Sequence, residues 1–272
     1  MSAQPQSTWY PEAAGEQERQ RVLAAAARPE AVEQKRKLAQ AFRVLARVGV
    51  VGGLYEGLYG HISLRVPSEP HYFWVNPIAR AFAHMTEDDL VLMSGDGKIL
   101  AGANMHNFAA FFIHSAIHSA RPEINCVAHT HPRNGCAFAA LDRLLEPIDQ
   151  VGCAFFEDHA LHREYSGVIE GRDQGDAIVE SLGANRSLIL VNHGLLTCGE
   201  TVEQATIDMY ELERTCEVQL LAMATGQPLR AIPAEHARQV RGIRTAERRY
   251  RGEWMLLMQL LKEEGGARPL SR

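Results

Sequence analysis

The sequence predicts a mixed α/β domain in which short buried strands alternate with amphipathic helices. Residues 124–128 and 187–191 are apolar runs with β-branched members, and each is short and leads into polar residues, as buried strands do. Leu38, Phe42 and Leu45 recur at the spacing of one helix face among charged and polar neighbours. No internal repeat or low-complexity linker divides the chain, so a single domain is expected.

Length and composition limit the classes of protein to which the chain can belong. Its 272 residues, 46% of them apolar, suffice for a substantial core. A net charge of -5 and a pI near 6.2 argue against nucleic-acid binding, which requires a basic surface. The apolar runs are far shorter than the roughly 18 residues of a membrane span and the N-terminus is polar, so we expect no membrane span, no export signal and a cytoplasmic location. The five cysteines include no C-x-x-C pair and are expected to be reduced core residues.

The expected domain organisation is a tail followed by one body. Residues 1–30 mix Gln, Glu, Ala and Pro and are interpreted as an N-terminal tail that could dock on the body or on a neighbouring subunit. Residues 31–272 are expected to form the domain, and residues 234–261 its C-terminal helical extension.

The first half of the body contains several predicted strands. They are residues 58–66, 73–77, 90–93 and 99–100, with a hairpin turn at 95–98. In the first strand His61, Ser63 and Arg65 share one face, because successive side chains alternate between the two faces of a sheet. That face is either exposed to solvent or forms a wall of a functional site.

A histidine-rich helix is expected at residues 104–120, with Asn104 as its N-cap. His106, His114 and His118 lie on one stripe of this helix, at positions i, i+8 and i+12. The surface is the expected place for His118, which is near the C-terminal end. His106 and His114 are the candidates for a site.

The second half of the body alternates helices and strands. The expected elements are helices at 133–141 and 173–182, strands at 151–156 and 195–199, and a helix that runs from a capping box at 201–204 to residue 226. The titratable segment 157–162, which includes Glu157 and His159, follows a predicted strand end. It forms either the mouth of a site or a solvated loop.

Three histidines at strand ends form a candidate metal site. His129 and His131 are two positions apart, so their side chains lie on one face of the strand, roughly 6.6 Å apart along it, and can converge on one ion. His193 follows the second apolar run at an equivalent place. Three neutral nitrogen ligands with open positions suit a catalytic Zn, Mn or Fe ion better than a closed structural site. The alternative is that each histidine is a hydrogen-bonded structural or surface residue.

Four motifs, in this order, make the chain similar to the class II aldolase/adducin family over residues 31–226. They are Gly-His-Ile-Ser-Leu-Arg at 60–65, Arg-Pro-Glu at 121–123, His-Thr-His-Pro at 129–132 and Asn-His-Gly-Leu at 192–195. The resemblance implies a three-layer α/β/α fold with a mainly antiparallel central sheet and a homotetramer with sites near subunit interfaces. It also implies that His129, His131 and His193 are the metal ligands.

The chain departs from the sugar-phosphate aldolases of this family in ways that bear on the substrate. Ala110 stands where those enzymes carry an acidic residue that assists catalysis. Residues 75–79 replace a phosphate-binding segment rich in Ser, Thr and Gly, and His61 replaces an Asn common in the first motif. Too few small donors remain to hold a phosphate dianion, so an uncharged or aromatic substrate is expected.

Within the family, the chain looks most similar to the coenzyme-free non-haem iron oxygenases of aminocoumarin antibiotic biosynthesis, the prenylated 4-hydroxybenzoate synthase type. That resemblance implies Fe(II), O2 as co-substrate and no organic coenzyme. The implied reaction is oxidative, decarboxylating cleavage of the side chain of a 4-hydroxyphenyl 2-oxo or 2-hydroxy acid to an aromatic acid or aldehyde. The roles assigned are catalytic for His114, His159 and Glu157 and substrate-binding for His61, Arg65 and His106.

Three alternatives remain open. A Mn- or Zn-dependent decarboxylase of a hydroxylated aromatic acid would use the ion as a Lewis acid without O2. A class II aldolase would need its carboxylate from another residue, such as Glu157. An adducin-like scaffold would be non-catalytic, and residues 263–272 do not resemble the lysine-rich tail of adducins.

Overall fold

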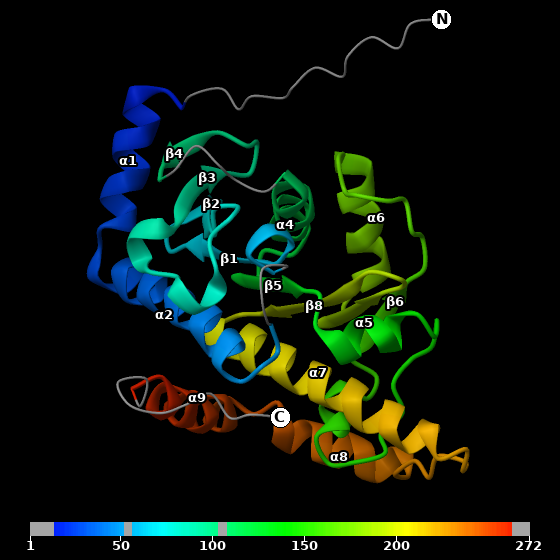
Figure 1. The fold of residues 1–272 in the computed structure, drawn as a ribbon. Coiled ribbons are helices and arrows are strands. Elements are labelled where there is room, and N and C mark those ends of the chain that lie inside the picture. Colours follow the sequence, from blue (N-terminus) through cyan, green and yellow to red (C-terminus); the bar gives the residue numbers. More distant parts are fainter. Residues whose placement is uncertain (1–13, 52–55, 103–107, 263–272) are drawn as a thin grey trace, which may run out of the picture.

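The fold is built on one central sheet, seen in a computed structural model that describes residues 14–51, 56–102 and 108–262 (Figure 1). Within these ranges eight strands pair in the order β4-β3-β2-β1-β5-β8-β7-β6. The strands are β1 His61–Val66, β2 Glu69–Val75, β3 Val91–Ser94, β4 Ile99–Ala101, β5 Cys126–Thr130, β6 His159–His162, β7 Ser187–Leu190 and β8 Gly194–Gly199. All neighbouring pairs are antiparallel except β6 and β7, which are parallel. The prediction of a mainly antiparallel sheet is therefore confirmed.

Helices cover both faces of the sheet and complete the predicted three layers (Figure 1). Helices α2 (Pro29–Arg47) and α7 (Val202–Ala224) pack on one face, and α4 (Phe108–Ala120) and α6 (Arg172–Leu182) pack on the other. The remaining helices are α1 Glu16–Ala26, α3 Glu56–Tyr59, α5 Arg133–Ala139, α8 Ala234–Arg244 and α9 Glu247–Lys262, with short 3-10 turns η1 Phe82–His84, η2 Glu87–Asp89 and η3 Gly152–Phe155. None of the helices in the described ranges is both long and apolar enough to cross a membrane.

Helix α2 anchors its layer through the face that the sequence predicts. Leu38, Phe42 and Leu45 are fully buried, and the ring of Phe42 meets that of Phe82 edge-on with centroids 4.7 Å apart. Burying each such side chain contributes about 1.5–3 kcal/mol relative to leaving it exposed. The spacing of these residues therefore identifies the packed face correctly.

Strand β1 has an apolar face and a polar face, and both are buried. Ile62 and Leu64 join the core beneath α2 and α7, whereas His61, Ser63 and Arg65 point to the opposite face of the sheet, which α4 covers. The first interpretation offered for the polar face, exposure to solvent, is wrong. A buried polar face requires internal hydrogen-bond partners, and these residues have them.

Two predicted elements differ in the structure. Residues 151–156 do not form a strand, because the Asp149 side chain accepts a hydrogen bond from Gly152 N at 2.6 Å and starts the turn that becomes η3. The expected single helix at 234–261 is two helices, since the chain turns at Thr245, whose N–H and hydroxyl both bond the carbonyl of Arg241. By contrast, the predicted capping box at 201–204 is present at the start of α7.

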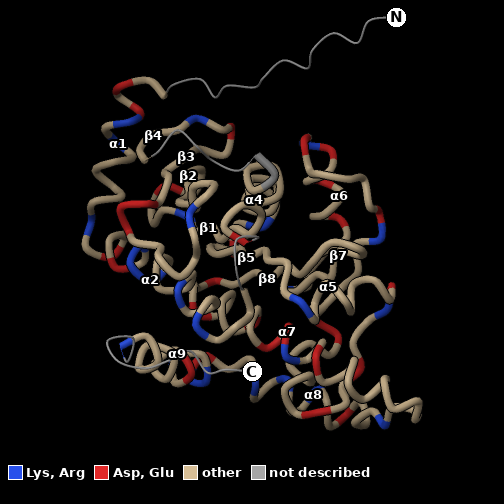
Figure 2. The backbone as a smooth tube through the Cα atoms, in the orientation of Figure 1, with Lys and Arg blue, Asp and Glu red and all other residues tan. Residues whose placement is uncertain are grey.

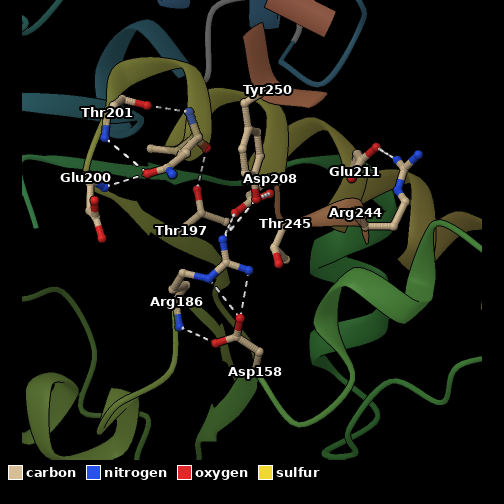
Figure 3. Close-up of polar contacts among 12 residues, drawn as sticks. Asp158, Arg186, Thr197, Glu200, Thr201, Asp208, Glu211, Arg244, Thr245 and Tyr250 are labelled. Atoms are coloured by element: carbon tan, nitrogen blue, oxygen red, sulfur yellow. Dashed lines mark hydrogen bonds and ion pairs between the residues drawn. The ribbon is translucent and has the colours of Figure 1, made fainter. Parts of the chain in front are cut away.

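A partly buried ionic cluster ties α9 to α7 and to the sheet (Figure 3). The Arg186 guanidinium, just before β7, binds Asp158 at 2.7 Å and Asp208 of α7 at 3.1 Å. The Tyr250 hydroxyl of α9 accepts from Arg186 at 2.9 Å and donates to Asp208 at 2.8 Å. Burial raises the pKa of Asp208 to about 6, and the neighbouring Arg186 acts against that rise. The Asp208 carboxylate therefore stays charged only while both Arg186 and Tyr250 contact it.

Charge pairing continues along the outer helices. Arg244 of α8 and Arg249 of α9 both contact the buried Glu211 carboxylate of α7. Figure 2 shows basic and acidic positions interspersed around α8 and α9. These pairs are partly buried, so loss of one partner would leave an uncompensated charge.

We expect Tyr250→Phe to lower the free energy of unfolding by about 1–3 kcal/mol, because it leaves Asp208 and Arg186 each without one buried hydrogen-bond partner. Urea denaturation followed by circular dichroism measures this loss. Tyr165→Phe is the matched control, since Tyr165 is exposed. Equal stability of the two variants would contradict this account of the cluster.

Candidate metal centre

The structure brings the three predicted ligand histidines together at one end of the central strands. His129 lies near the end of β5, His131 directly follows this strand, and His193 lies in the turn between β7 and β8. Their candidate ligand nitrogens are all within 4.8 Å of one another. The ring centroids are 4.6 to 4.9 Å apart, so one ion could contact all three rings.

Local backbone features fix the β7–β8 turn that carries His193. Asn192 adopts a φ of 58°, a left-handed conformation that Asn tolerates better than most residues. A Cβ at Gly194 would lie 2.6 Å from the Thr130 carbonyl oxygen and 3.2 Å from Cδ2 of His131. The Asn-His-Gly sequence therefore allows β8 to approach β5 closely enough for the rings to converge.

Hydrogen bonding leaves the His129 nitrogen that faces His193 free of a proton. Its Nδ1 lies 2.9 Å from the Leu195 carbonyl oxygen, which can only accept, so Nδ1 carries the hydrogen and Nε2 has a lone pair. That Nε2 is 3.3 Å from Nε2 of His193. Such closely spaced ring nitrogens are the arrangement that a shared cation would stabilise.

Burial keeps His129 and His193 neutral, which is the form that binds metals. Desolvation, followed by the neighbouring His131 and His193, holds the pKa of His129 well below its usual value. Burial also lowers the pKa of His193 to about 4. A set of three imidazoles fits a divalent ion with open coordination positions, such as Fe(II), Mn(II) or Zn(II).

Glu56 is a site residue that sequence reasoning missed. Its buried carboxylate accepts a hydrogen bond from His131 N at 2.8 Å through Oε1, and Oε2 lies 3.6 Å from Nδ1 of His131. A Cβ at Gly60 would lie 2.1 Å from the same Oε2, so glycine leaves the space that the carboxylate occupies. The only sequence signal was position, because Glu56 lies four residues before the Gly-His-Ile-Ser motif.

The position of the usual aldolase carboxylate lies in an apolar cluster. Ala110 is buried in a cluster with Phe73, Val75, Met93 and Phe111. A carboxylate is nevertheless present at the centre, because Glu56 approaches it from α3. The chain therefore differs from the expected pattern in where the carboxylate originates.

His61 and His114 lie beside the candidate metal centre. Antiparallel pairing of β1 with β5 sets His61 directly opposite His129, and their ring centroids are 4.8 Å apart. Nδ1 of His61 is 2.6 Å from Nε2 of His114, which α4 presents to the sheet. Burial lowers the pKa of His114 to about 3 and holds that of His61 well below its usual value. His106 lies outside the described residues.

The structure separates Arg65 from the centre, contrary to its predicted substrate-binding role. Arg65 is four residues from His61 along β1, or about 13 Å at the rise of a strand. Its guanidinium donates to the backbone carbonyls of Ile124, His118 and Pro70. It therefore satisfies carbonyls near the C-terminal end of α4, a place where a cation is favourable.

His159 and Glu157 are also separated from the centre, because β6 runs parallel to β7. His159 pairs with Ser187, at the end of β7 away from His193, and both its ring nitrogens contact backbone groups. Glu157 is exposed and forms an ion pair with Arg238 of α8. His162, at the other end of β6, pairs with Leu190 and so lies on the side of the centre.

The expectation that His118 is exposed is wrong. Its side chain is only 5% accessible, and its Nε2 lies 2.8 Å from the Ser63 hydroxyl oxygen. The reason is that α4 packs its histidine stripe on β1, so His118 in the last turn is buried as His114 is in the middle.

Comparisons with known proteins agree with this geometry. A family model for the Class II Aldolase and Adducin N-terminal domain matches residues 36–220. The chain is 40% identical to Decarboxylase NovR of Streptomyces niveus over 201 residues, which are 74% of this chain and 73% of that protein. It is also 40% identical over 201 residues to the 4-hydroxy-3-prenylphenylpyruvate oxygenase/4-hydroxy-3-prenylbenzoate synthase of Streptomyces roseochromogenus subsp. oscitans, with 74% and 71% covered.

Among solved structures, the L-fuculose 1-phosphate aldolase of Glaciozyma antarctica PI12 is similar, with a TM-score of 0.77 and 33% sequence identity. The similarity covers 89% of this chain and 96% of that one.

We expect His129→Ala, His131→Ala and His193→Ala each to weaken metal binding by more than the roughly 10–100-fold that loss of a supporting residue costs. The strands around these residues are independently apolar, so circular dichroism should show a retained fold. Metal content after dialysis measures the effect, with the exposed His71→Ala as control. Full occupancy in any variant would remove that histidine from the ligand set.

Glu56→Gln should weaken metal binding about tenfold and Glu56→Ala up to about 100-fold, since the first loses the charge near His131 and the second also loses the hydrogen bond to its backbone. Isothermal titration with Zn2+ measures both affinities. Glu87→Gln, on η2, is the control. Unchanged affinity in Glu56→Ala would exclude a role for this carboxylate at the centre.

Proposed function

The chain belongs to the class II aldolase and adducin family, and from this membership and its three-histidine centre we propose that it is a non-haem Fe(II)-dependent oxygenase without an organic coenzyme. Its substrate is a 4-hydroxyphenyl 2-oxo or 2-hydroxy acid. The reaction is oxidative, decarboxylating cleavage of the side chain, which gives an aromatic acid or aldehyde.

The observation that carries this proposal is a ligand set made only of imidazoles in a chain so similar to an enzyme named for oxygenation of a prenylated phenylpyruvate. Three protein ligands leave room for a chelating 2-oxo or 2-hydroxy acid. The apolar cluster around Ala110, with Phe73 and Phe111, supports an aromatic substrate over a sugar phosphate. The chain is similar to two relatives that are both named as enzymes, which supports an enzymatic, metal-dependent activity.

The residues of this chain have separable tasks in the proposed reaction. His129, His131 and His193 hold the ion, and Fe(II), when bound, supplies the one-electron chemistry that O2 requires. Glu56 orients His131 through its backbone N–H. His61, backed by His114, lies beside the ligands, where it can contact a polar group of the substrate. Glu56, His61, His114 and His129 are buried and His131 and His193 are half-buried, which limits the access of bulk water to the reacting groups.

When the product is an aromatic acid, the proposed reaction has a fixed stoichiometry. An arylpyruvate and two O2 give an aryl carboxylic acid, two CO2 and one water, so both lost carbons leave as CO2. A 2-hydroxy acid one carbon shorter needs one O2 and releases one CO2 and one water. In both cases one CO2 appears for every O2 consumed.

We expect the Fe(II)-loaded protein to consume O2 with 4-hydroxyphenylpyruvate and to release CO2 in a ratio of one to one. An oxygen electrode and trapped 14CO2 measure the two quantities. His193→Ala, loaded under the same conditions, should show neither. Release of CO2 from the substrate under anaerobic conditions would overturn the oxygenase proposal.

A Mn- or Zn-dependent decarboxylase of a hydroxylated aromatic acid is the second candidate, favoured by the name of the relative from Streptomyces niveus. There the ion would polarise the carboxylate or an adjacent oxygen. An aldolase is a further candidate, because Glu56 supplies a carboxylate beside the centre and a similar solved structure is a sugar-phosphate aldolase. Anaerobic turnover with Mn2+ or Zn2+ separates these two candidates from the first.

We also infer a homotetramer. Leu58 and Tyr59 of α3 are apolar side chains that are 38% and 50% exposed, and they lie beside the buried Glu56 of the centre. A subunit contact at α3 would cover this apolar surface and would also close the site. Light scattering coupled to size exclusion measures the assembly.

A further inference from the structure

A chain of hydrogen bonds runs through the interior from the candidate metal centre to the last turn of α4. Nδ1 of His61 lies 2.6 Å from Nε2 of His114, whose Nδ1 is 2.5 Å from the Ser63 hydroxyl oxygen. That oxygen is 2.8 Å from Nε2 of His118, whose Nδ1 is 3.4 Å from the Ile124 carbonyl oxygen. The pairing works because residues two apart in a strand and four apart in a helix each share a face.

The far end of the chain sets the direction of every bond in it. The Ile124 carbonyl can only accept, so His118 carries its proton on Nδ1 and its Nε2 accepts from the Ser63 hydroxyl. The Ser63 oxygen then accepts from Nδ1–H of His114, and Nε2 of His114 accepts from Nδ1–H of His61. For neutral rings this leaves a lone pair on Nε2 of His61.

The surroundings of the chain favour neutral rings. Burial lowers the pKa of His118 well below its usual value, and the nearby Arg65 guanidinium adds to this effect. The pKa of His114 falls to about 3 through burial. An added proton would therefore be unfavourable on both rings. The chain of hydrogen bonds is suited to fix the orientation of its members and not to store a proton.

The near end of the chain lies beside the metal centre. The His61 ring is 4.8 Å from that of His129, measured between centroids, across the β1–β5 pairing. Among the residues that the structure describes, no protein atom forms a hydrogen bond with Nε2 of His61. A lone pair without a protein partner at this place is available to a donor that enters the centre.

We propose that His118, Ser63 and His114 fix His61 in its Nδ1–H tautomer and thereby present its Nε2 to the metal centre as a hydrogen-bond acceptor. Ser63 and His118 are then positioning residues that act through His114 and His61. The acceptor would recognise a hydroxyl group, such as the enol of a 2-oxo acid or the alcohol of a 2-hydroxy acid. Only this choice of ligand rests on the proposed function.

Nitrogen NMR of the zinc-loaded, 15N-histidine-labelled full-length protein tests the proposal, because the protonated and bare nitrogens of a neutral imidazole have well-separated shifts. We expect His61, His114 and His118 each to show protonated Nδ1 and bare Nε2, with assignments from the single His→Gln variants. A protonated Nε2 on His61 would overturn the proposal.

Ser63→Ala removes the hydrogen bonds that link His114 to His118 and provides a second test. His118 should keep its Nδ1–H, whereas His114 and His61 should lose their single tautomer. Ser115→Ala, a buried serine of α4 outside the chain, should leave all three unchanged. If Ser63→Ala does not fold, the parent spectrum still decides. The expected tautomers in a protein that consumes no O2 would reject the proposed oxygenase activity and leave this inference standing.

Discussion

The antiparallel register of β1, β5 and β8 is the constraint on which the centre depends. It sets His61 opposite His129 and His129 opposite Leu196, so that the turn before β8 carries His193 to the same end of the sheet. A shift of the β5 register by one residue would move His129 to the face beneath α7 and separate it from His193. The register is in turn held by the alternation of apolar residues in β1 and β5, because their other face must meet the core.

Placing so many imidazoles on a buried face carries an energetic cost that the fold offsets with hydrogen bonds. Burying an amide or hydroxyl without a partner costs about 1–3 kcal/mol judged from mutations, and charged groups cost more. Here His129 bonds the Leu195 carbonyl, and His114 and His118 bond Ser63. The result is a neutral polar layer between α4 and the sheet, which is the state that metal ligands require.

The origin of the carboxylate distinguishes this site from the aldolase pattern. In this chain the position on α4 is the apolar Ala110, and the carboxylate is that of Glu56 on α3, which accepts a hydrogen bond from the backbone N–H of His131. The charge therefore lies beside a candidate ligand, and the corresponding position of α4 is apolar. That division of roles is consistent with an aromatic substrate and with a ligand set made only of imidazoles.

The sequence by itself determined the three candidate ligand histidines and the packed face of α2, because a strand-end His-x-His pair, a second strand-end His and a helical apolar stripe are local patterns. Only the tertiary structure decided the places of Glu56, His118 and His159. Glu56 meets its partner across 75 residues, and His118 is buried because α4 packs on β1. His159 points away from the centre since β6 is parallel to β7. Strand direction and long-range contact leave no periodic signal in a sequence, so these positions followed from the fold alone.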